Sequence, residues 1–455
     1  MIAELPYRAN GAELFGHIAQ RPWAVYLDSG RPGSSYGRYD ILAADPFITL
    51  VTRCGKTEIR QGEDVRISSE DPFMLLQRTL RQFPASAGEL PFAGGAIGYF
   101  SYDLARRLEH LPDTAVDAEH MPEMAVGVYD WAVVLDHEQR RAWLVGQGFD
   151  ARTQQRWDEL RALFSASAVT QAETFKTTGL ISSNMDMDTY AAAFRRVLDY
   201  IQAGDCYQVN LAQRFSTKAE GDAWTAYLQL RRISPAPFSA YLNTPAAQIL
   251  SASPECFLKV RDGRVETKPI KGTRPRSLDL AQDLENADEL RASLKDRAEN
   301  LMIVDLLRND IGKSCAVGSV KAERLFELES FANVHHLVST VTGTLAEGRD
   351  AIDLLRGCFP GGSITGAPKL RAMQIIEELE PHRRGVYCGA IGYIGFDGNM
   401  DTSIAIRTAV YSGGSIRFWA GGGIVADSEM DKEYRETWDK ASSMLQLMEQ
   451  FHVGG

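Results

Sequence analysis

Lys271 is the residue whose surroundings in the sequence could support covalent chemistry. It follows a strand-like run over residues 264–270 and stands in Pro269-Ile270-Lys271-Gly272-Thr273. A lysine at the end of a strand is usually solvated. A buried lysine would have a lowered pKa and could act as a nucleophile, with Glu255 at the end of a neighbouring strand as a general acid. The local pattern leaves both interpretations open.

Two acidic pairs have the spacing that suits a metal ion. Asp296 and Glu299 are three residues apart, as are Glu433 and Glu436, so each pair projects from one face of an expected helix. Acids on solvated helix surfaces would give the same pattern. The alternative is that two helices each offer a carboxylate to one Mg²⁺, which binds one or two carboxylates together with water and substrate oxygens.

Several further residues could bind an anion. Arg407 lies within an expected strand over 402–411, where a charge is costly unless it meets an anion. The run Gly421–Gly423 frees backbone amides to approach a ligand, although a plain glycine turn would look the same. The loop Gly361–Lys369 lacks the Gly-Lys-Ser/Thr ending of a phosphate loop, and its amides suit a carboxylate equally well.

The elements that would position these residues alternate between hairpins and helices. Residues 164–178 have no sustained period and predict a linker between an N-terminal region over 1–165 and a catalytic region over 180–452. Asp262-Gly263 predicts a hairpin turn between strands. We expect further elements as helices at 72–83, 190–201, 279–309 and from 427, and strands at 207–211, 248–260, 264–270, 386–396, 402–411 and 415–420. This order predicts an α+β fold with antiparallel sheets.

Composition excludes several classes of protein. The 455 residues carry 49 Lys and Arg against 60 Asp and Glu, a net charge of −11, so nucleic acid is not an expected partner. No apolar run is long enough to span a membrane, and the N-terminus does not look like a signal peptide. The six cysteines are scattered singly. We therefore expect a reduced, cytoplasmic protein.

Taken together and in order, these motifs resemble the chorismate-binding enzymes, a family of anthranilate, aminodeoxychorismate, isochorismate and salicylate synthases. The resemblance covers roughly residues 185–450. The runs that carry it are Asp205–Asn210, Ser253–Glu255, Pro269–Thr273, Asp296–Asp310, His336–Ser339, Phe359–Lys369, Ile406–Thr408 and Gly421–Ser428.

The resemblance implies a large antiparallel two-sheet sandwich with the active site between the sheets and the N-terminal region packed on the same body. It also implies roles for residues that match the family's motifs. Glu299 and Glu436 would bind Mg²⁺, with Asp296 and Glu433 nearby, and Glu255 would be the general acid. The implied contacts to chorismate are Arg407, Tyr393, Gly422, Gly423, His336, Ser363 and Lys369.

Two positions separate the members of the family. Isochorismate and salicylate synthases have a lysine that activates water where this chain has Gln208, which favours ammonia as the nucleophile here. Anthranilate synthases read Pro-Ile-Ala-Gly-Thr where this chain has Lys271, and aminodeoxychorismate synthases resemble this chain. The resemblance thus implies amination of chorismate at C4, through a covalent Lys271 adduct at C2, for 4-aminobenzoate and folate synthesis.

The resemblance also implies partners and alternatives. No cysteine has the setting of a glutaminase nucleophile, so ammonia would come from a separate amidotransferase subunit. Relatives hold tryptophan near the N-terminus, and the matching residues are Ser29, Tyr36, Gly37, Arg38, Tyr39, Pro237, Phe238 and Ser239. Leu27-Asp28-Ser29 departs from the usual Glu-Ser pair, which puts regulation in doubt. The alternatives are an anthranilate synthase large subunit and an inactive scaffold that docks the amidotransferase.

Overall fold

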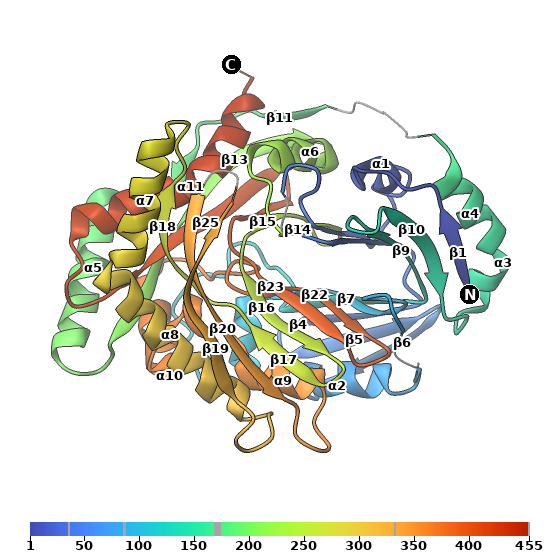
Figure 1. Cartoon of the computed structure of the whole chain (residues 1–455), viewed down its shortest axis with the longest axis horizontal. Coiled ribbons are helices and arrows are strands. Elements are labelled where there is room, and N and C mark those ends of the chain that lie inside the picture. Colours follow the sequence, from blue (N-terminus) through green and yellow to red (C-terminus); the bar gives the residue numbers. More distant parts are fainter. Residues whose placement is uncertain (35–36, 85–87, 168–173, 332–333, 454–455) are drawn as a thin grey trace.

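The computed structural model describes residues 1–34, 37–84, 88–167, 174–331 and 334–453 (Figure 1). Within these ranges the chain forms one sheet of 13 strands, sheet A, and one of 12 strands, sheet B. Neighbouring strands in both sheets run antiparallel. The expected α+β fold with two large antiparallel sheets is confirmed. No helix in the described ranges has the length and apolar character needed to cross a membrane.

Sheet A combines strands from both halves of the chain. Its order is β1 (Ile2–Leu5), β10 (Arg141–Gly146), β9 (Trp131–Asp136), β3 (Tyr39–Ala43), β2 (Ala24–Asp28), β14 (Phe238–Asn243), β15 (Gln248–Ser253), β24 (Thr408–Ser412), β25 (Ser415–Ile424), β13 (Gln208–Gly221) and β11 (Phe175–Thr177), while β12 (Ser182–Ser183) and β21 (Gly366–Ala367) also pair with β13. Because β2 pairs with β14, the N-terminal and C-terminal regions share one sheet.

Sheet B is likewise built from both halves. Its order is β18 (Ile270–Pro275), β20 (Val334–Thr344), β17 (Arg264–Thr267), β16 (Cys256–Arg261), β23 (Met400–Ile404), β22 (Ala390–Gly395), β7 (Gly95–Phe100), β8 (Met124–Tyr129), β4 (Ile48–Arg53), β5 (Lys56–Gln61) and β6 (Asp64–Ser68), with β19 (Lys321–Ser330) paired to β20. The sequence Gly-Ala-Ile-Gly-Tyr occurs in both β7 and β22, and these two strands are direct neighbours, with Gly98 opposite Gly392.

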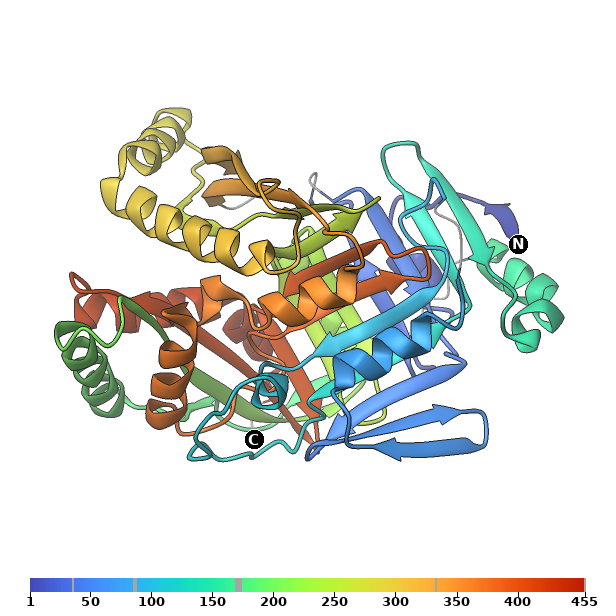
Figure 2. The same ribbon diagram turned by 90° about the horizontal axis from the view of Figure 1, so that it is seen from below.

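Helices cover the outer faces of the two sheets and gather at one end. They are α1 (Ala12–Phe15), α2 (Pro72–Leu80), α3 (Ala151–Gln155), α4 (Trp157–Ser165), α5 (Met187–Gln202), α6 (Ala223–Ile233), α7 (Leu280–Ala292), α8 (Leu294–Gly312), α9 (Ala351–Cys358), α10 (Lys369–Leu379) and α11 (Met430–Gln450), with 3₁₀ turns η1 (Tyr102–Arg107) and η2 (Gly362–Ile364). Figure 2 shows α2 and α9 side by side over sheet B, while α5, α7, α8, α10 and α11 lie together on the left of Figure 1.

The main core lies between the sheets and under α2 and α9. Every residue of β7, β8 and β22 is buried, since these strands are covered on both faces. This is why they are continuous apolar or glycine runs rather than alternating ones. Helix α2 begins where Asp71 accepts a hydrogen bond from the amide of Phe73, and it buries Phe73 in this core.

The predicted linker at 164–178 is shorter than expected. Phe164 and Ser165 end helix α4, and Phe175–Thr177 form β11, which pairs with β13. Phe164 and Phe175 are both buried, and residues 168–173 lie outside the described ranges. The small polar residues of this segment predict a loop, but burial of the two aromatic side chains stabilises a helix end and a strand start there.

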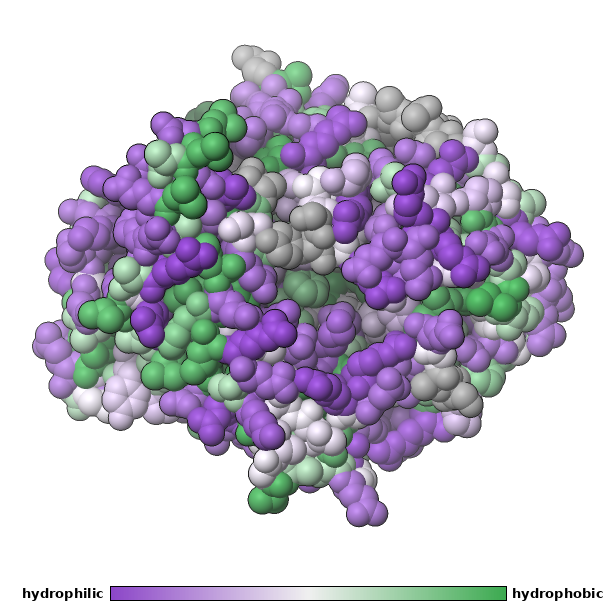
Figure 3. Space-filling model, viewed as in Figure 1, coloured by the Kyte–Doolittle hydropathy of each residue, from purple (hydrophilic) through white to green (hydrophobic). Residues whose placement is uncertain are grey.

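The helix predicted over 279–309 is two helices. Helix α7 ends at Ala292, and Ser293 caps α8 by accepting a hydrogen bond from the amide of Asp296. Alanine, serine and leucine at this junction give no sign of a break, since neither glycine nor proline is present. Figure 3 shows apolar side chains on the outer surface of these helices, where Leu280 and Leu294 are exposed. Glu299, one of the predicted metal ligands, lies on α8.

Candidate active site

Lys271 lies in β18, where the strand is irregular. The pairing of β18 with β20 shifts register between Lys271 and Thr273, around Gly272. Gly272 has a φ of +80°, and a Cβ there would lie 2.8 Å from Leu290 Cδ1 and 2.9 Å from Asp296 Cγ, so only glycine fits. The Lys271 ammonium donates to the carbonyl oxygen of Ser363 at 3.4 Å. The irregularity therefore turns Lys271 toward the η2 turn.

The charge state of Lys271 is set by burial and by three carboxylates. Burial lowers the pKa of Lys271, and the nearby Lys440 ammonium lowers it further, whereas the carboxylates of Glu299, Glu255 and Glu436 oppose the shift. The net direction is downward. A larger share of Lys271 is therefore in the neutral, nucleophilic form than for a solvated lysine.

Glu255 lies between β15 and β16 and meets Lys271 through Ser363. Its side chain is buried, and Oε1 accepts a hydrogen bond from Ser363 Oγ at 2.7 Å. Burial raises the pKa of Glu255, while this hydrogen bond and the positive charge of Lys271 oppose the shift. Ser363 thus contacts both residues, with its hydroxyl on Glu255 and its carbonyl on Lys271, and Glu255 has the environment of a proton donor.

Carboxylates from α8 and α11 face the same region. Burial raises the pKa of Glu299, and the negative charge of Glu436 contributes in the same direction. Burial would also raise the pKa of Glu436, but an ion pair with Lys440 at 2.6 Å makes the net shift downward. Within the described ranges no group of three or more His, Cys, Asp or Glu side chains is arranged to hold a metal ion. Helices α8 and α11 therefore supply two carboxylates, those of Glu299 and Glu436, rather than a complete set of metal ligands.

The remaining two acids of the predicted pairs are engaged by the protein. Glu433 accepts a hydrogen bond from Ser428 Oγ at 2.6 Å, and Asp296 pairs with Arg274 at 3.2 Å. Burial raises the pKa of Glu433. Of the four acids, Glu299 has no hydrogen bond or ion pair within the described ranges, whereas Glu436 pairs with Lys440, which a bound cation would have to displace.

Glycines in β25 allow these groups to approach the strand. A Cβ on Gly422 would lie 3.2 Å from oxygen atoms of both Glu433 and Glu436. A Cβ on Gly423 would lie 2.7 Å from Gln208 Nε2. The glycine run is therefore a packing requirement of the site and not a turn, since both residues lie inside a strand.

Arg407 lies in a break between strands and not within one strand, which corrects the expected strand over 402–411. Strand β23 ends at Ile404 and β24 begins at Thr408, and Arg407 has a φ of +49°. Burial lowers the pKa of its guanidinium. In the described part of the chain no hydrogen bond or ion pair engages this guanidinium. A half-buried guanidinium without a partner among the described residues is suited to bind an anionic ligand.

His336 is a buried neutral base beside Arg407. Its Nδ1 shares a hydrogen bond with Thr273 Oγ1 at 2.9 Å, and its Nε2 has no partner among the described residues. Burial and the positive charge of Arg407 lower the pKa of His336 to about 4. A buried nitrogen without a partner next to a cation fits contact with a polar ligand.

The lowered pKa of His336 predicts a pH dependence of stability. The unfolded chain binds a proton at His336 near pH 6.5, whereas the folded chain does so near pH 4, so stability is lost as the pH falls between these values. The full loss is about 3 kcal/mol for this pKa difference. We expect the thermal midpoint of His336→Gln to fall less between pH 7.5 and pH 5 than that of the unaltered protein. An equal fall in both proteins would contradict this prediction.

Two predicted contacts to the substrate, Lys369 and Tyr393, have partners within the protein. Lys369 donates to Asp310 Oδ2 at 2.6 Å and to the carbonyl of Cys358 at 2.8 Å, which anchors the start of α10. Tyr393 is buried against Phe92, and burial together with the negative charge of Asp401 raises its pKa. The structure thus joins Lys271, Glu255, Ser363, Glu299 and Glu436 through contacts or charges. Arg407 acts on His336, which bonds Thr273 two residues after Lys271, while Lys369 and Tyr393 have other partners.

One residue of this region, Lys440, was not predicted from the sequence, whereas Gln208 was considered there only as the position that favours ammonia. Lys440 pairs with Glu436 and donates to the Gly421 carbonyl at 3.0 Å, and its charge acts on both Lys271 and Glu255. Gln208 is buried, and neither polar atom of its side chain has a partner in the described ranges. The position of Lys440, four residues after Glu436, was the available signal for it.

The predicted tryptophan pocket falls on a buried polar cluster in sheet A. Ser29 donates to Asp40 at 2.6 Å, Ser239 is buried, and a Cβ on Gly37 would lie 2.3 Å from the Ser29 carbonyl. Arg38 pairs with Asp136 and stacks over Tyr39, Pro237 and Phe238 are half-buried, and Tyr36 lies outside the described ranges. Tryptophan binding stays a prediction.

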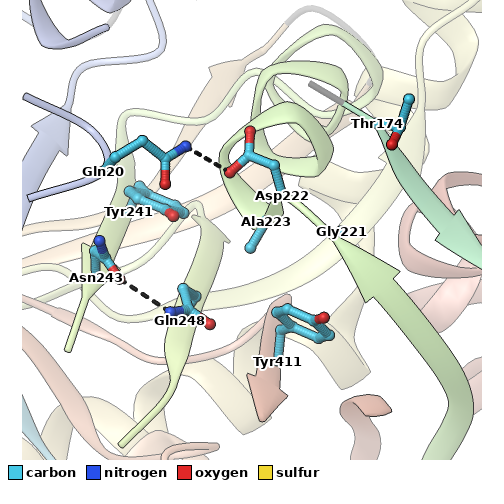
Figure 4. Close-up of a pocket in the computed structure, with 9 residues that line it drawn as sticks. All are labelled: Gln20, Thr174, Gly221, Asp222, Ala223, Tyr241, Asn243, Gln248 and Tyr411. Atoms are coloured by element: carbon cyan, nitrogen blue, oxygen red, sulfur yellow. Dashed lines mark hydrogen bonds between the residues drawn. The ribbon is translucent and has the colours of Figure 1, made fainter. Parts of the chain in front are cut away.

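Two open pockets in the described part of the chain lie away from the predicted site residues. A pocket of about 560 Å³ lies beside the start of α6, lined by residues that include Asp222, Tyr241 and Tyr411 (Figure 4). A second, of about 560 Å³, lies at the end of α8. Neither contains a predicted site residue. In the first, Gln20 already bonds Asp222 and Gln248 bonds Asn243, so much of its polar lining is satisfied internally.

The sequence and the fold of the chain are similar to those of known proteins. The model of the family described as chorismate binding enzyme matches residues 24–446. Aminodeoxychorismate synthase component 1 of Salmonella typhimurium is 48% identical over 452 residues, 98% of each chain. The protein of the same name from Escherichia coli K12 is 47% identical over 452 residues, also 98% of each chain. The crystal structure of anthranilate synthase component I from Streptococcus pneumoniae superposes with a TM-score of 0.81 at 32% identity, covering 90% of this chain and 92% of that one. The chain belongs to the chorismate-binding enzyme family.

Proposed function

We propose that this chain is the chorismate-aminating component of a 4-amino-4-deoxychorismate synthase. The observation that carries the proposal is Lys271, whose pKa is lowered by burial and which is linked to the buried Glu255 through Ser363. The aminodeoxychorismate synthases at 47% and 48% identity support the same activity. The product would serve 4-aminobenzoate and folate synthesis.

The proposed chemistry uses Lys271 as a nucleophile and Glu255 as the proton donor. The neutral Lys271 amine attacks C2 of chorismate and a C–N bond forms. Both ring double bonds shift, and the C4–O bond breaks as Glu255 protonates the departing hydroxyl to water. The Glu255 carboxylate then takes a proton from the adduct nitrogen. Ammonia attacks C4, both double bonds shift back, and the C2–N bond breaks as Glu255 returns its proton to the Lys271 nitrogen, which leaves as an amine. The new amino group on C4 is formed as an ammonium. Two displacements retain the configuration at C4.

Substrate binding would use the cationic and amide groups of the site. Chorismate carries two carboxylates, and the Arg407 guanidinium and the Gly422 and Gly423 amides would hold one of them. His336, neutral because of its low pKa, would offer Nε2 as a hydrogen-bonding partner. Lys440 pairs with Glu436, and we propose that its ammonium also faces the anionic substrate.

Glu299 and Glu436 fit a magnesium ion. Both lie within electrostatic reach of Lys271, and Gly422 leaves room beside the Glu436 carboxylate. Two carboxylates with substrate and water oxygens suit Mg²⁺, which rarely takes a complete protein cage. When bound, Mg²⁺ would neutralise a substrate carboxylate and help the C4 oxygen depart. Lys440, which now pairs with Glu436, would give up this contact.

Ammonia would come from a separate amidotransferase subunit. Burial raises the pKa of Cys358 far above its ordinary range, so this thiol has no nucleophilic character, and burial also raises the pKa of Cys256 and Cys388. The relatives are named component 1, which implies a second component. We therefore propose that the chain works with free ammonium alone and with glutamine only beside its partner.

The product of the reaction tests the proposal. We expect the chain to consume chorismate when Mg²⁺ and ammonium are supplied, and to form 4-amino-4-deoxychorismate without the fluorescence of anthranilate. Fluorescent anthranilate would show an anthranilate synthase instead, and no consumption of chorismate would show an inactive scaffold. Glutamine should replace ammonium only after the amidotransferase subunit is added.

A further inference from the structure

Arg384 and Glu380 form a buried ion pair between α10 and β22. Arg384 Nε donates to Glu380 Oε2 at 2.9 Å, and Nη2 donates to Oε1 at 2.6 Å. Arg384 is 1% exposed and Glu380 is 4% exposed. Neither residue contacts Lys271, Glu255 or the carboxylates of the site, so the proposed chemistry gives this pair no role.

The pair ties together two backbone segments of the site. Arg384 Nη1 donates to the carbonyl of Ile364 at 2.9 Å, and Nη2 donates to the carbonyl of Asn210 at 2.8 Å. Glu380 Oε1 accepts from the amide of Ala212 at 2.9 Å. The ring of Tyr102 lies 5.0 Å from the guanidinium carbon, which holds the plane of the group. One guanidinium thus joins η2 to β13.

The segments that Arg384 joins carry site residues. Ile364 directly follows Ser363, whose hydroxyl donates to Glu255 and whose carbonyl accepts from Lys271. Asn210 lies two residues after Gln208 in β13. A planar guanidinium can donate to a carboxylate and two carbonyls at once, whereas an ammonium on a flexible stem cannot fix this geometry. Buried ion pairs add little net stability, so stability alone does not account for this one.

We propose that Arg384 and Glu380 are a positioning pair that holds the Ser363 turn against Lys271 and Glu255. The pair bonds the backbone of the turn at Ile364 and touches neither substrate nor reacting atoms. The inference rests on the proposed function, since it assigns the pair to that site. Its consequence is that the hydrogen bond from Ser363 to Glu255 depends on Arg384.

The variants Arg384→Lys and Glu380→Gln test this proposal against Ser363→Ala. We expect both pair variants to shift the turn. A shift of about 1 Å would lower kcat by roughly 10²-fold, while the KM for chorismate would change less. Loss of the Ser363 hydrogen bond raises the pKa of Glu255, so the alkaline limb of the kcat profile moves to higher pH in all three variants. Combining Arg384→Lys with Ser363→Ala should add little to either change alone.

Arg106→Lys is the matched control. Arg106 pairs with Glu377, three residues before Glu380, with both side chains largely buried. The Glu377 carboxylate accepts from the amides of Thr114 and Ala115, and neither side chain bonds the Ser363 turn. Hydrogen exchange of residues 361–367 should rise in Arg384→Lys and Glu380→Gln and stay unchanged in Arg106→Lys. Hydrogen exchange does not depend on enzyme activity, so it tests the positioning role even if Arg384→Lys is inactive.

Two results would overturn the positioning role. One is an unshifted alkaline limb in Arg384→Lys together with effects that add fully to those of Ser363→Ala. The other is unchanged exchange over 361–367 in both pair variants; if Arg384→Lys does not fold, Glu380→Gln alone gives this result. Activity is followed as consumption of chorismate, which is independent of the ring carbon aminated. An anthranilate product would therefore refute the proposed function and leave the positioning result standing.

Discussion

Lys271→Ala is expected to lower the rate of C4 amination of chorismate by about 10³-fold or more, a barrier increase of roughly 4 kcal/mol. The reason is that ammonia attacks C4 with retention only if another nucleophile has first occupied C2. Without the lysine, ammonia that attacks C2 directly would give the precursor of anthranilate. The measurement is the rate of 4-amino-4-deoxychorismate formation at saturating ammonium, with anthranilate fluorescence followed in parallel.

Lys268→Ala is the matched control for this variant. Lys268 lies three residues before Lys271 in the same segment, and its charge acts on Glu329 and Cys256, not on the site carboxylates. It should retain the rate of the unaltered protein. Amination of C4 at the normal rate by Lys271→Ala, with no covalent adduct in the unaltered protein, would refute the nucleophilic role of Lys271.

Glu299→Gln and Glu436→Gln are expected to raise the half-saturating Mg²⁺ concentration by on the order of 10-fold or more and to lower kcat. A neutral amide attracts a divalent cation far less than a carboxylate does. Glu436→Gln also removes the ion pair with Lys440, whose charge lowers the pKa of Lys271 and opposes the rise in the pKa of Glu255. This variant should therefore alter the pH profile as well.

Asp305→Asn serves as the control for the metal variants. Asp305 lies on α8 like Glu299, but it pairs with the exposed Arg308 on the outer surface of the helix. Its half-saturating Mg²⁺ concentration should equal that of the unaltered protein. An unchanged Mg²⁺ dependence in both Glu299→Gln and Glu436→Gln would contradict their assignment as metal ligands.

The fold could be predicted from the sequence where patterns are local. The hairpin at Asp262-Gly263 joins β16 to β17 as expected, and both residues have positive φ. Helix α5 follows the apolar spacing from Tyr190 to Val197. The break at Ser293 and the pairing of β2 with β14 were not predictable, because the first leaves no glycine or proline and the second depends on residues far apart in the chain.

The site could be predicted residue by residue only in part. Ser363 is far from Glu255 and Lys271 in sequence. Gly272 is a local signal for an irregular strand, but it does not show that the register shift turns Lys271 toward Ser363. Lys369 looked like an anion-binding lysine, but its bond to Asp310 depends on how α8 packs near α10. Side-chain direction is set by tertiary packing, which spacing in one segment does not encode.

Mass spectrometry of the intact protein with chorismate and Mg²⁺, in the absence of ammonium, tests the covalent role of Lys271 most directly. The adduct at C2 should accumulate, since no second nucleophile is present to release the lysine. The predicted result is a mass increase of chorismate less one water, located on the peptide that contains Lys271 and absent from Lys271→Ala. Rapid C4 amination on adding ammonium, by a protein that never carries this mass on Lys271, would contradict the account.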